Sequence, residues 1–471
     1  MQRNTLKSFQ WSFFTALLRK VILFGVFLLV AKAISKEDLG IFREFSLVLG
    51  MITAISYFGF KDLLIVKKEN TQKLFHQLFL LSLLVSFTSL ILLNILAPII
   101  GKYYKSDILS DLLIKLSPLI CLEILRIAVR AYYQKILRFK LLALIETINV
   151  VVYSALIGVF FFFQLNITTL IMIFYLGNLI EFILLLSFES QLIKESFRRV
   201  FTQKLFKDFL ITYKQNFKFL VTATSNNVVS MLINDLPVII LGILFNPVFI
   251  GIYYLANQLI GQPVILACNS LAQVLFPTFT FMDKTEIYDR LKKFFNVVTL
   301  FAYPLFFLFV IYVLNLVPLI LGDKWNESLP IVVILAFPLA TTMLINPISS
   351  LPYVLEKPHI EIIYMIINLS IKSIAIYLGH FSGFETALLY YAIATVIIHL
   401  GFITLVSRLV NGNPVKTLVS VILKSIPTLT FIGIYLLTDN QNILLRLAFI
   451  TGLIGIYLLF GKLFKFINIR G

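Results

Sequence analysis

The feature that most constrains this chain is a series of long apolar runs that recur along almost its whole length. FFTALLRKVILFGVFLLVA (13–31) and HQLFLLSLLVSFTSLILLNILAP (76–98) are two of them. A helix needs about 20 mostly apolar residues to cross the hydrocarbon core of a bilayer. Only 13% of the residues are charged, about half the share in ordinary soluble domains. The predicted fold class is therefore an all-α polytopic membrane protein.

Hydropathy predicts about fourteen transmembrane helices joined by short connections. Their expected ranges are 9–34, 40–66, 76–100, 111–133, 141–163, 168–188, 217–245, 250–280, 293–320, 329–354, 360–379, 384–408, 416–437 and 443–464. The longest polar connection runs from about Glu189 to Lys218. No connection is long enough to hold an inserted soluble domain.

Basic residues orient these spans. With an even number of helices, both termini lie on one side, and that side carries about 26 Lys and Arg against about seven on the other. Cytoplasmic loops collect positive charge, so both termini are predicted to be cytoplasmic. The same bias accounts for the formal net charge of +17 without a nucleic-acid partner.

A weak internal repeat divides the chain. ISKEDLGIFREFSLVLG (34–50) aligns with FNPVFIGIYYLANQLIG (245–261), which pairs Gly40 with Gly251 and Gly50 with Gly261. The repeat predicts two parallel six-helix lobes around a central cavity. The expected domains are an N-terminal lobe (1–190), a cytoplasmic connector (191–216), a C-terminal lobe (217–410) and two final helices (411–471).

Two adjacent cations interrupt the first apolar run. Ionisable groups within a span are costly and generally face a cavity or a partner. Arg19 shares one helix face with Ser8, Ser12 and Thr15, whereas Lys20 lies about 100° round the helix. Arg19 is the stronger candidate for a substrate cavity, and Lys20 is expected at its rim or paired with an acid. Arg19→Ala should impair the protein's function far more than Ser8→Ala.

The predicted seventh helix, which the repeat makes the counterpart of the first, carries its own polar stripe. Thr222, Asn226, Ser230 and Asn234 recur at every fourth position, with Asp235 beside them. Two equivalent polar helices indicate a wet cleft. Hydrogen bonding between helices is the alternative for such small polar residues.

Further charges lie within the predicted fourth and eleventh helices. Glu123 and Arg126 are spaced to form an ion pair, and Lys372 has no acidic residue within one turn. With Arg19 and Lys20, the basic residues favour an anionic substrate, because guanidinium groups bind phosphate oxygens in a bidentate manner. The acids Glu123 and Asp235 are candidates for carrying H⁺ or Na⁺.

Other chemistries lack a signal in the sequence. The four histidines are scattered without metal-ligand spacing, and no nucleotide-binding loop is present. No catalytic residue, metal or cofactor is expected. A membrane-embedded polymerase or glycosyltransferase would need a long loop for its active site, and none is predicted.

Several stretches resemble Wzx-type flippases, the polysaccharide-biosynthesis branch of the multidrug/oligosaccharidyl-lipid/polysaccharide (MOP) exporter superfamily. They cover roughly the first 360 residues in the expected order. They are AKAISKEDLGIF (31–42), YFGFKDLLI (57–65), QKILRFKLLALIE (134–146), NDLPVIILGILFNPVFIGIYYLANQL (234–259), VLFPTF (274–279) and LGDKWNESLP (321–330).

The resemblance implies a flippase that moves undecaprenyl-pyrophosphate-linked oligosaccharide to the outer leaflet of the bacterial inner membrane by alternating access. It implies cavity roles for Arg19, Lys20 and Asp235, and plausibly for Arg126 and Lys372. The expected partners are the lipid-linked oligosaccharide and membrane lipids, with a polysaccharide polymerase and a chain-length regulator as further candidates for a monomeric protein. The alternative is a cation-coupled exporter of small molecules from the same superfamily.

Overall fold

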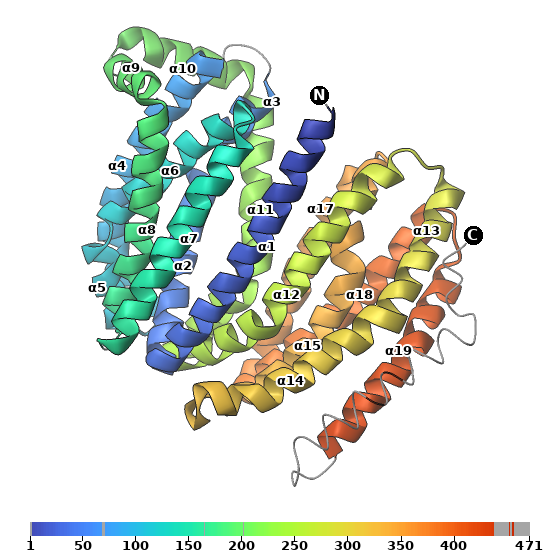
Figure 1. The fold of residues 1–471 in the computed structure, drawn as a ribbon. Helices are drawn as coiled ribbons and strands as arrows, with labels where there is room; N and C mark the ends of the chain where they lie inside the picture. Colours follow the sequence, from blue (N-terminus) through green and yellow to red (C-terminus); the bar gives the residue numbers. More distant parts are fainter. Residues whose placement is uncertain are drawn as a thin grey trace. The chain divides into compact units, whose positions relative to one another are not determined.

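The computed structural model describes residues 2–67, 71–163, 165–200 and 202–437, with the isolated positions 452 and 455. Every regular element in these ranges is helical, which confirms the all-α prediction. The chain forms two compact units, Met1–Gly251 and Ile252–Gly471. Figure 1 shows the helices coloured along the chain.

The first unit is built from eleven helices and the start of a twelfth. They are α1 (Gln2–Ala33), α2 (Lys36–Ser56), α3 (Phe60–Val66), α4 (Thr71–Tyr103), α5 (Asp107–Lys115), α6 (Pro118–Lys135), α7 (Phe139–Phe162), α8 (Ile167–Phe188), α9 (Ser190–Val200), α10 (Gln203–Gln215), α11 (Phe217–Leu244) and α12 (Pro247–Phe279). Helix α1 packs on α7, α6 packs on α4 and α8, and α2 packs on α11. The charged residues described below lie on these helices.

The second unit contains the rest of α12 and the helices that follow. They are α13 (Lys284–Val297), α14 (Tyr303–Leu321), α15 (Ser328–Ile345), α16 (Leu351–Val354), α17 (Pro358–His380), α18 (Phe384–Leu409) and α19 (Pro414–Leu437). A π-helical segment, Val298–Ala302, joins α13 to α14 without a break. Helix α18 packs on α15, α17 and α19.

Ten helices or continuous helical stretches in the described residues are long and apolar enough to cross a membrane. Large apolar side chains such as Phe87, Ile95 and Ile397 lie exposed on their outer faces, where lipid is the solvent that accepts them. The predicted count of fourteen is not confirmed. The expected last span, 443–464, lies outside the described residues.

Two predicted spans were wrong as single helices. The 40–66 range is broken between α2 and α3, where Gly59 takes a φ of +70°, a backbone conformation that favours glycine. The 111–133 range is broken between α5 and α6, directly before Pro118. Leu116 leaves the helical conformation, with a φ of −103° and a ψ of 6°. Pro118 lies at the start of α6, where proline is favoured because its missing N–H would have no partner within the helix.

The polar connector is also helical. Helices α9 and α10 lie across one end of the first unit (Figure 1), and both contact α4. Helix α9 is strongly amphipathic: it buries Leu192 and Ile193 and exposes Arg198 and Arg199. Such a helix suits the interface between membrane and water.

The two glycines aligned by the repeat contact each other within the first unit. A Cβ atom on Gly40 would lie 1.8 Å from the carbonyl oxygen of Pro247, and one on Gly251 would lie 1.9 Å from that of Lys36. Each glycine thus meets the carbonyl four residues before the other. The contact has the reciprocal form that two equivalent segments make across a two-fold axis, and it requires glycine at both positions. The lobe boundaries themselves stay a prediction.

Candidate functional site

Six charged side chains in the first unit form one continuous row of ion pairs between membrane helices. Arg19 on α1 contacts Glu146 on α7 at 2.8 Å, and Glu146 also pairs with Arg130 on α6. Arg130 and Arg126 both contact Glu181 on α8, at 3.3 and 2.8 Å. Arg126 ends the row at Glu123, 2.6 Å away. The row joins four helices and holds three positive and three negative groups.

Uncharged groups complete the hydrogen bonding of this row. The Asn149 side chain donates to Glu181 at 2.8 Å, and the Asn178 side chain donates to Glu123 at 3.2 Å. Arg19 also donates to the Ala143 carbonyl at 3.0 Å and to the Thr147 hydroxyl at 3.2 Å. Buried charges are tolerated when they are paired and hydrogen-bonded in this way.

The predicted pairing of Glu123 with Arg126 is confirmed, but the row extends it. Arg130, which lies one turn further along α6 than Arg126, pairs with Glu146 and Glu181. Because the row is neutral as a whole, it does not attract an anion by net charge. An anion that bound Arg19 or Arg126 would have to replace a carboxylate as the partner of the guanidinium group.

The second cation of α1 lies apart from this row. Lys20 is exposed, whereas the Arg19 side chain is largely buried against α7. The structure thus separates the two cations as the helical spacing predicts. The side chains of Ser8, Ser12 and Thr15, expected on the Arg19 face, lie outside the described residues.

Helix α11 presents a polar face along its length. Thr222, Asn226, Ser230 and Asn234 are all exposed within the first unit, as their spacing predicts. Asn227, next to this face, donates to Asp62 at 3.3 Å. Amides are poorly accepted by lipid hydrocarbon, so this face favours contact with water or protein.

Asp235 lies beside that face and forms an ion pair with Arg43 on α2. Both side chains are partly exposed, at 23% and 18%. Sequence analysis did not single out Arg43. The two paired residues are 192 positions apart in the sequence, so no local sequence pattern predicts the pair.

Lys372 lies in the second unit and is not part of the charged row. Its side chain on α17 is 7% exposed. The ammonium group is 5.5 Å from the centre of the Tyr391 ring, a cation–π distance. In the part of the chain that the structure describes, it forms no ion pair with a carboxylate. Asn368 on α17 and His399 on α18, the helix that carries Tyr391, are also buried polar residues. The His399 ring lies 2.8 Å from the Thr341 hydroxyl.

Sequence reasoning missed several members of these clusters. Asn149 and Asn178 are isolated amides in apolar runs. A polar residue within a membrane span generally marks a contact with another polar group, so this signal could have identified both. Glu44 is fully buried on α2, and neither of its side-chain oxygens has a hydrogen-bond partner among the described residues. It lies in the quoted stretch ISKEDLGIFREFSLVLG and was not singled out.

The arrangement of helices defines the class of the protein as an all-α multi-pass membrane protein whose fold is shared with solved flippase and transporter structures. The fold matches the lipid II flippase MurJ in an inward closed conformation, with a TM-score of 0.68, 18% identity, and 96% of this chain and 98% of that chain covered. An inward-facing multidrug resistance MATE family transporter matches with a TM-score of 0.50 and 12% identity over 83% of this chain and 94% of that one. At these identities the likeness is one of fold.

Within that class, the chain belongs to the polysaccharide biosynthesis protein family, whose model matches residues 29–330. The lipopolysaccharide biosynthesis protein WzxC of Escherichia coli (strain K12) is 22% identical over 369 residues, 77% of this chain and 72% of that protein. The teichuronic acid biosynthesis protein TuaB of Bacillus subtilis (strain 168) is 24% identical over 300 residues, 62% of this chain and 59% of that protein. The resemblance to Wzx-type flippases is therefore confirmed, and the chain is a multi-pass inner-membrane protein.

Proposed function

We infer that this protein moves a polyprenyl-pyrophosphate-linked oligosaccharide, of the undecaprenyl type, from the cytoplasmic to the outer leaflet of the inner membrane. The observation that carries the proposal is the row of guanidinium groups within the membrane helices of a chain whose family makes polysaccharides. A pyrophosphate lipid needs cations at membrane depth, because its charge is otherwise expensive to bury.

Arg19 and Arg126 have the chemistry for this substrate. Each already holds a carboxylate through its guanidinium group, and phosphate oxygens accept the same fork of donors. Exchanging Glu146 or Glu181 for a substrate oxygen keeps each arginine paired throughout. The exchange avoids the cost of leaving a buried cation alone.

Lys20, Lys372, Asn226 and Asn234 serve the remainder of the substrate. Lys20 and the amides of α11 are exposed and polar, as recognition of sugar hydroxyls requires. Lys372 is a buried cation of the second unit. An acidic sugar or a phosphate oxygen would provide it with a negative partner.

Coupling to H⁺ or Na⁺ runs through Asp235 or Glu123 in this proposal. Each acid pairs with an arginine, Arg43 or Arg126. Binding of H⁺ or Na⁺ to the carboxylate weakens its hold on the arginine, which is then free for the substrate. Flipping that is unchanged after both ion gradients collapse would argue against coupling.

Reconstituted vesicles test the transport itself. The purified protein is placed in proteoliposomes with a fluorescent lipid-linked oligosaccharide, and access of an impermeant quencher to the outer leaflet is followed. The expected result is movement between leaflets that empty vesicles do not show. A deletion strain without a redundant flippase should also stop exporting repeat units, and normal export from it would contradict the proposal.

The same experiments distinguish the multidrug exporter alternative. Loss of drug resistance in the deletion strain, with repeat-unit export intact, would favour that function. Polysaccharide polymerases and chain-length regulators are the partners expected for the flippase, which we propose acts as a monomer.

A further inference from the structure

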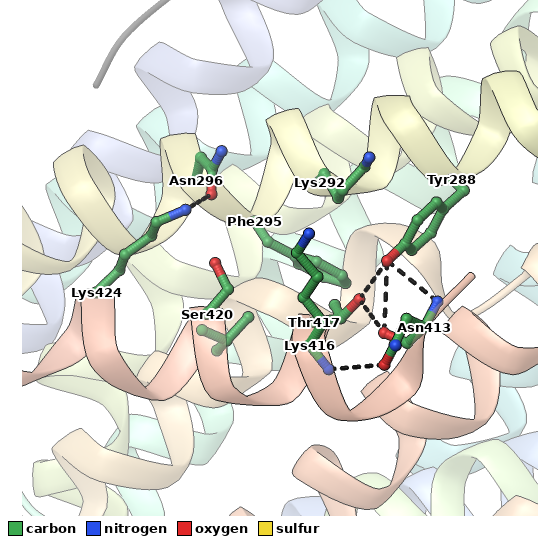
Figure 2. A pocket seen from close by; sticks show the side chains of 10 residues that line it. Tyr288, Lys292, Phe295, Asn296, Asn413, Lys416, Thr417, Ser420 and Lys424 are labelled. Atoms are coloured by element: carbon green, nitrogen blue, oxygen red, sulfur yellow. Dashed lines mark hydrogen bonds between the residues drawn. The ribbon is translucent and has the colours of Figure 1, made fainter. Parts of the chain in front are cut away.

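A basic cavity lies between α13 and α19 in the second unit (Figure 2). Its volume is about 490 Å³. Lys292 and Asn296 line it from α13, and Lys416, Ser420 and Lys424 line it from α19. None of the described residues that line it is acidic.

Three ammonium groups give this cavity its charge. Lys424 donates to the Asn296 side chain at 2.5 Å, which fixes its position at one end. Lys292 lies 4.6 Å from the Tyr288 ring centre and pairs with Asp289 on the outer surface of α13. Lys416 is exposed at the mouth. Such clusters attract phosphate groups as point charges.

The other end of the cavity is preformed by a clasp between the two helices. The Tyr288 hydroxyl lies 3.1 Å from the Thr417 hydroxyl and accepts from the backbone N–H of Asn413 at 3.2 Å. The Asn413 side chain in turn accepts from the backbone N–H of Lys416 at 2.9 Å and so begins α19 (Figure 2). A Cβ atom on Gly412 would come within 2.2 Å of the Tyr288 ring.

The local structure of α13 supports the same rigidity. Asp283 caps the helix by accepting from the backbone N–H groups of Thr285 and Glu286, and Glu286 bonds back to Asp283. Hydrogen bonds from the Thr285 side chain and the Glu286 backbone lower the pKa of the Asp283 carboxyl. The helix that carries Tyr288 and Lys292 therefore begins at a defined residue.

Apolar surface adjoins the cations. Phe295 and Val421 line the cavity and are buried, whereas Val419, Ile422 and Leu423 on α19 are exposed large hydrophobic residues. A helix with a basic, polar end beside an exposed apolar face matches the headgroup boundary of a bilayer. The basic bias predicts that this end of α19 lies on the cytoplasmic side, where basic pockets between helices bind anionic headgroups.

We propose that this cavity binds the phosphate of an anionic lipid headgroup. The phosphate sits among Lys292, Lys416 and Lys424, Ser420 donates to it, and the acyl chains lie along the apolar face of α19. Two lipids carry the required chemistry: an anionic membrane phospholipid and a polyprenyl pyrophosphate. The site is independent of the charged row, so its failure leaves the transport proposal untouched.

Titration of the purified full chain in detergent tests the site. Native mass spectrometry measures binding of cardiolipin, phosphatidylglycerol, a polyprenyl pyrophosphate and phosphatidylcholine. The wild type is expected to prefer the anionic lipids. Combined Lys292→Gln, Lys416→Gln and Lys424→Gln should weaken that binding roughly 100-fold, because each lysine near an anionic surface contributes about fivefold.

A matched variant controls for net charge. Lys204→Gln, Lys207→Gln and Lys214→Gln remove three exposed lysines from α10 and should leave lipid binding unchanged. Lys416→Gln alone alters one exposed side chain, so it should fold normally and weaken binding about fivefold.

The outcomes separate the two lipid sources. Stronger binding of phospholipid assigns the site to the membrane, and stronger binding of polyprenyl pyrophosphate assigns it to the lipid carrier; either supports a phosphate site. Equal affinity for phosphatidylcholine, or equal loss in the α10 control, would overturn the proposal.

Discussion

At the residue scale, the main question is how charges persist between membrane helices. The Arg126 side chain is 11% exposed and contacts both Glu123 and Glu181. Each carboxylate also accepts an amide hydrogen bond. Arg126, Glu123 and Glu181 thus compensate one another's charge and hydrogen-bonding capacity. The loss of one of them leaves the others with uncompensated charge.

Arg126→Met should therefore lower the free energy of unfolding by about 3–5 kcal/mol, the usual cost of breaking a buried pair. Thermal unfolding in detergent measures it. The control is Lys115→Met, because Lys115 pairs with Asp111 at the surface, where both side chains are about 70% exposed. That change should cost about 0–1 kcal/mol. Equal effects of the two substitutions would contradict the burial argument.

Glu44 gives the opposite expectation. Neither carboxyl oxygen has a hydrogen-bond partner among the described residues, and the side chain is fully buried. Burying a charge without a partner is costly, so Glu44→Gln, a neutral substitute of the same shape, should keep or raise the unfolding temperature. Glu123→Gln should lower it, since Glu123 holds Arg126. A larger loss from Glu44→Gln than from Glu123→Gln would show that Glu44 has an essential charged role.

Residue patterns predicted pairs within one helix and missed those between helices. Glu123 and Arg126 are three positions apart, so helical geometry alone places them together. Arg19 and Glu146 meet only because α1 packs on α7. The sequence does not show which helices pack together, so Arg19 and Glu146 each stood as an isolated charge in an apolar run.

At the scale of helices, the reciprocal contact of Gly40 and Gly251 fixes how α2 crosses the start of α12. The nearest atoms belong to backbone carbonyls, which cannot rotate away as a side chain can. A Cβ atom on Gly50, on the same helix, would come no closer than 3.9 Å to a neighbouring atom, which belongs to the Met231 side chain. Gly40 therefore requires glycine strictly, whereas Gly50 does not.

Gly40→Ala should sharply reduce the yield of folded protein, because its methyl group would overlap the Pro247 carbonyl. Gly50→Ala is the matched control and should be neutral or stabilising by up to about 1 kcal/mol, the difference between alanine and glycine in a helix. Fluorescence size-exclusion chromatography measures both. Normal folding of Gly40→Ala would show that α2 and α12 do not cross so closely.

Helix positions followed from hydropathy, but helix breaks did not. The average hydropathy stays high across Phe58–Gly59 and across Ser117–Pro118. Hydropathy therefore predicts one continuous helix at each place. The glycine and proline there were the available signals. Helices α9 and α10 were read as a polar connection because their apolar residues occupy only one face.

At the scale of the whole molecule, the basic bias predicts the orientation in the membrane. Lys204 on α10 is exposed and predicted to be cytoplasmic, whereas Lys324 follows α14 on the predicted outer side. In a variant without Cys121 and Cys268, Lys324→Cys should react with an impermeant maleimide on intact spheroplasts. Lys204→Cys should react only after permeabilisation. The reverse pattern would invert the topology.

The fold class and the family were readable from sequence because hydropathy and short motifs are local properties. The lobe boundaries at 191–216 stay a prediction. The compact units of the structure divide after Gly251, within α12. A repeat in sequence records equivalence between segments, and it does not state which segments pack together.

The central claim is that Arg19 contacts the lipid-linked substrate. Measuring lipid flipping by the Arg19→Ala variant in proteoliposomes tests this claim most directly. Arg19 links α1 to the charged row through Glu146, while Arg130 remains to hold Glu146 when Arg19 is removed. At matched reconstitution and unfolding temperature, we predict at least a tenfold loss for Arg19→Ala, about 1.4 kcal/mol or more of lost interaction, and near-normal transport by Ser8→Ala. Normal flipping of the lipid-linked oligosaccharide by Arg19→Ala would contradict the assignment of Arg19 to the substrate.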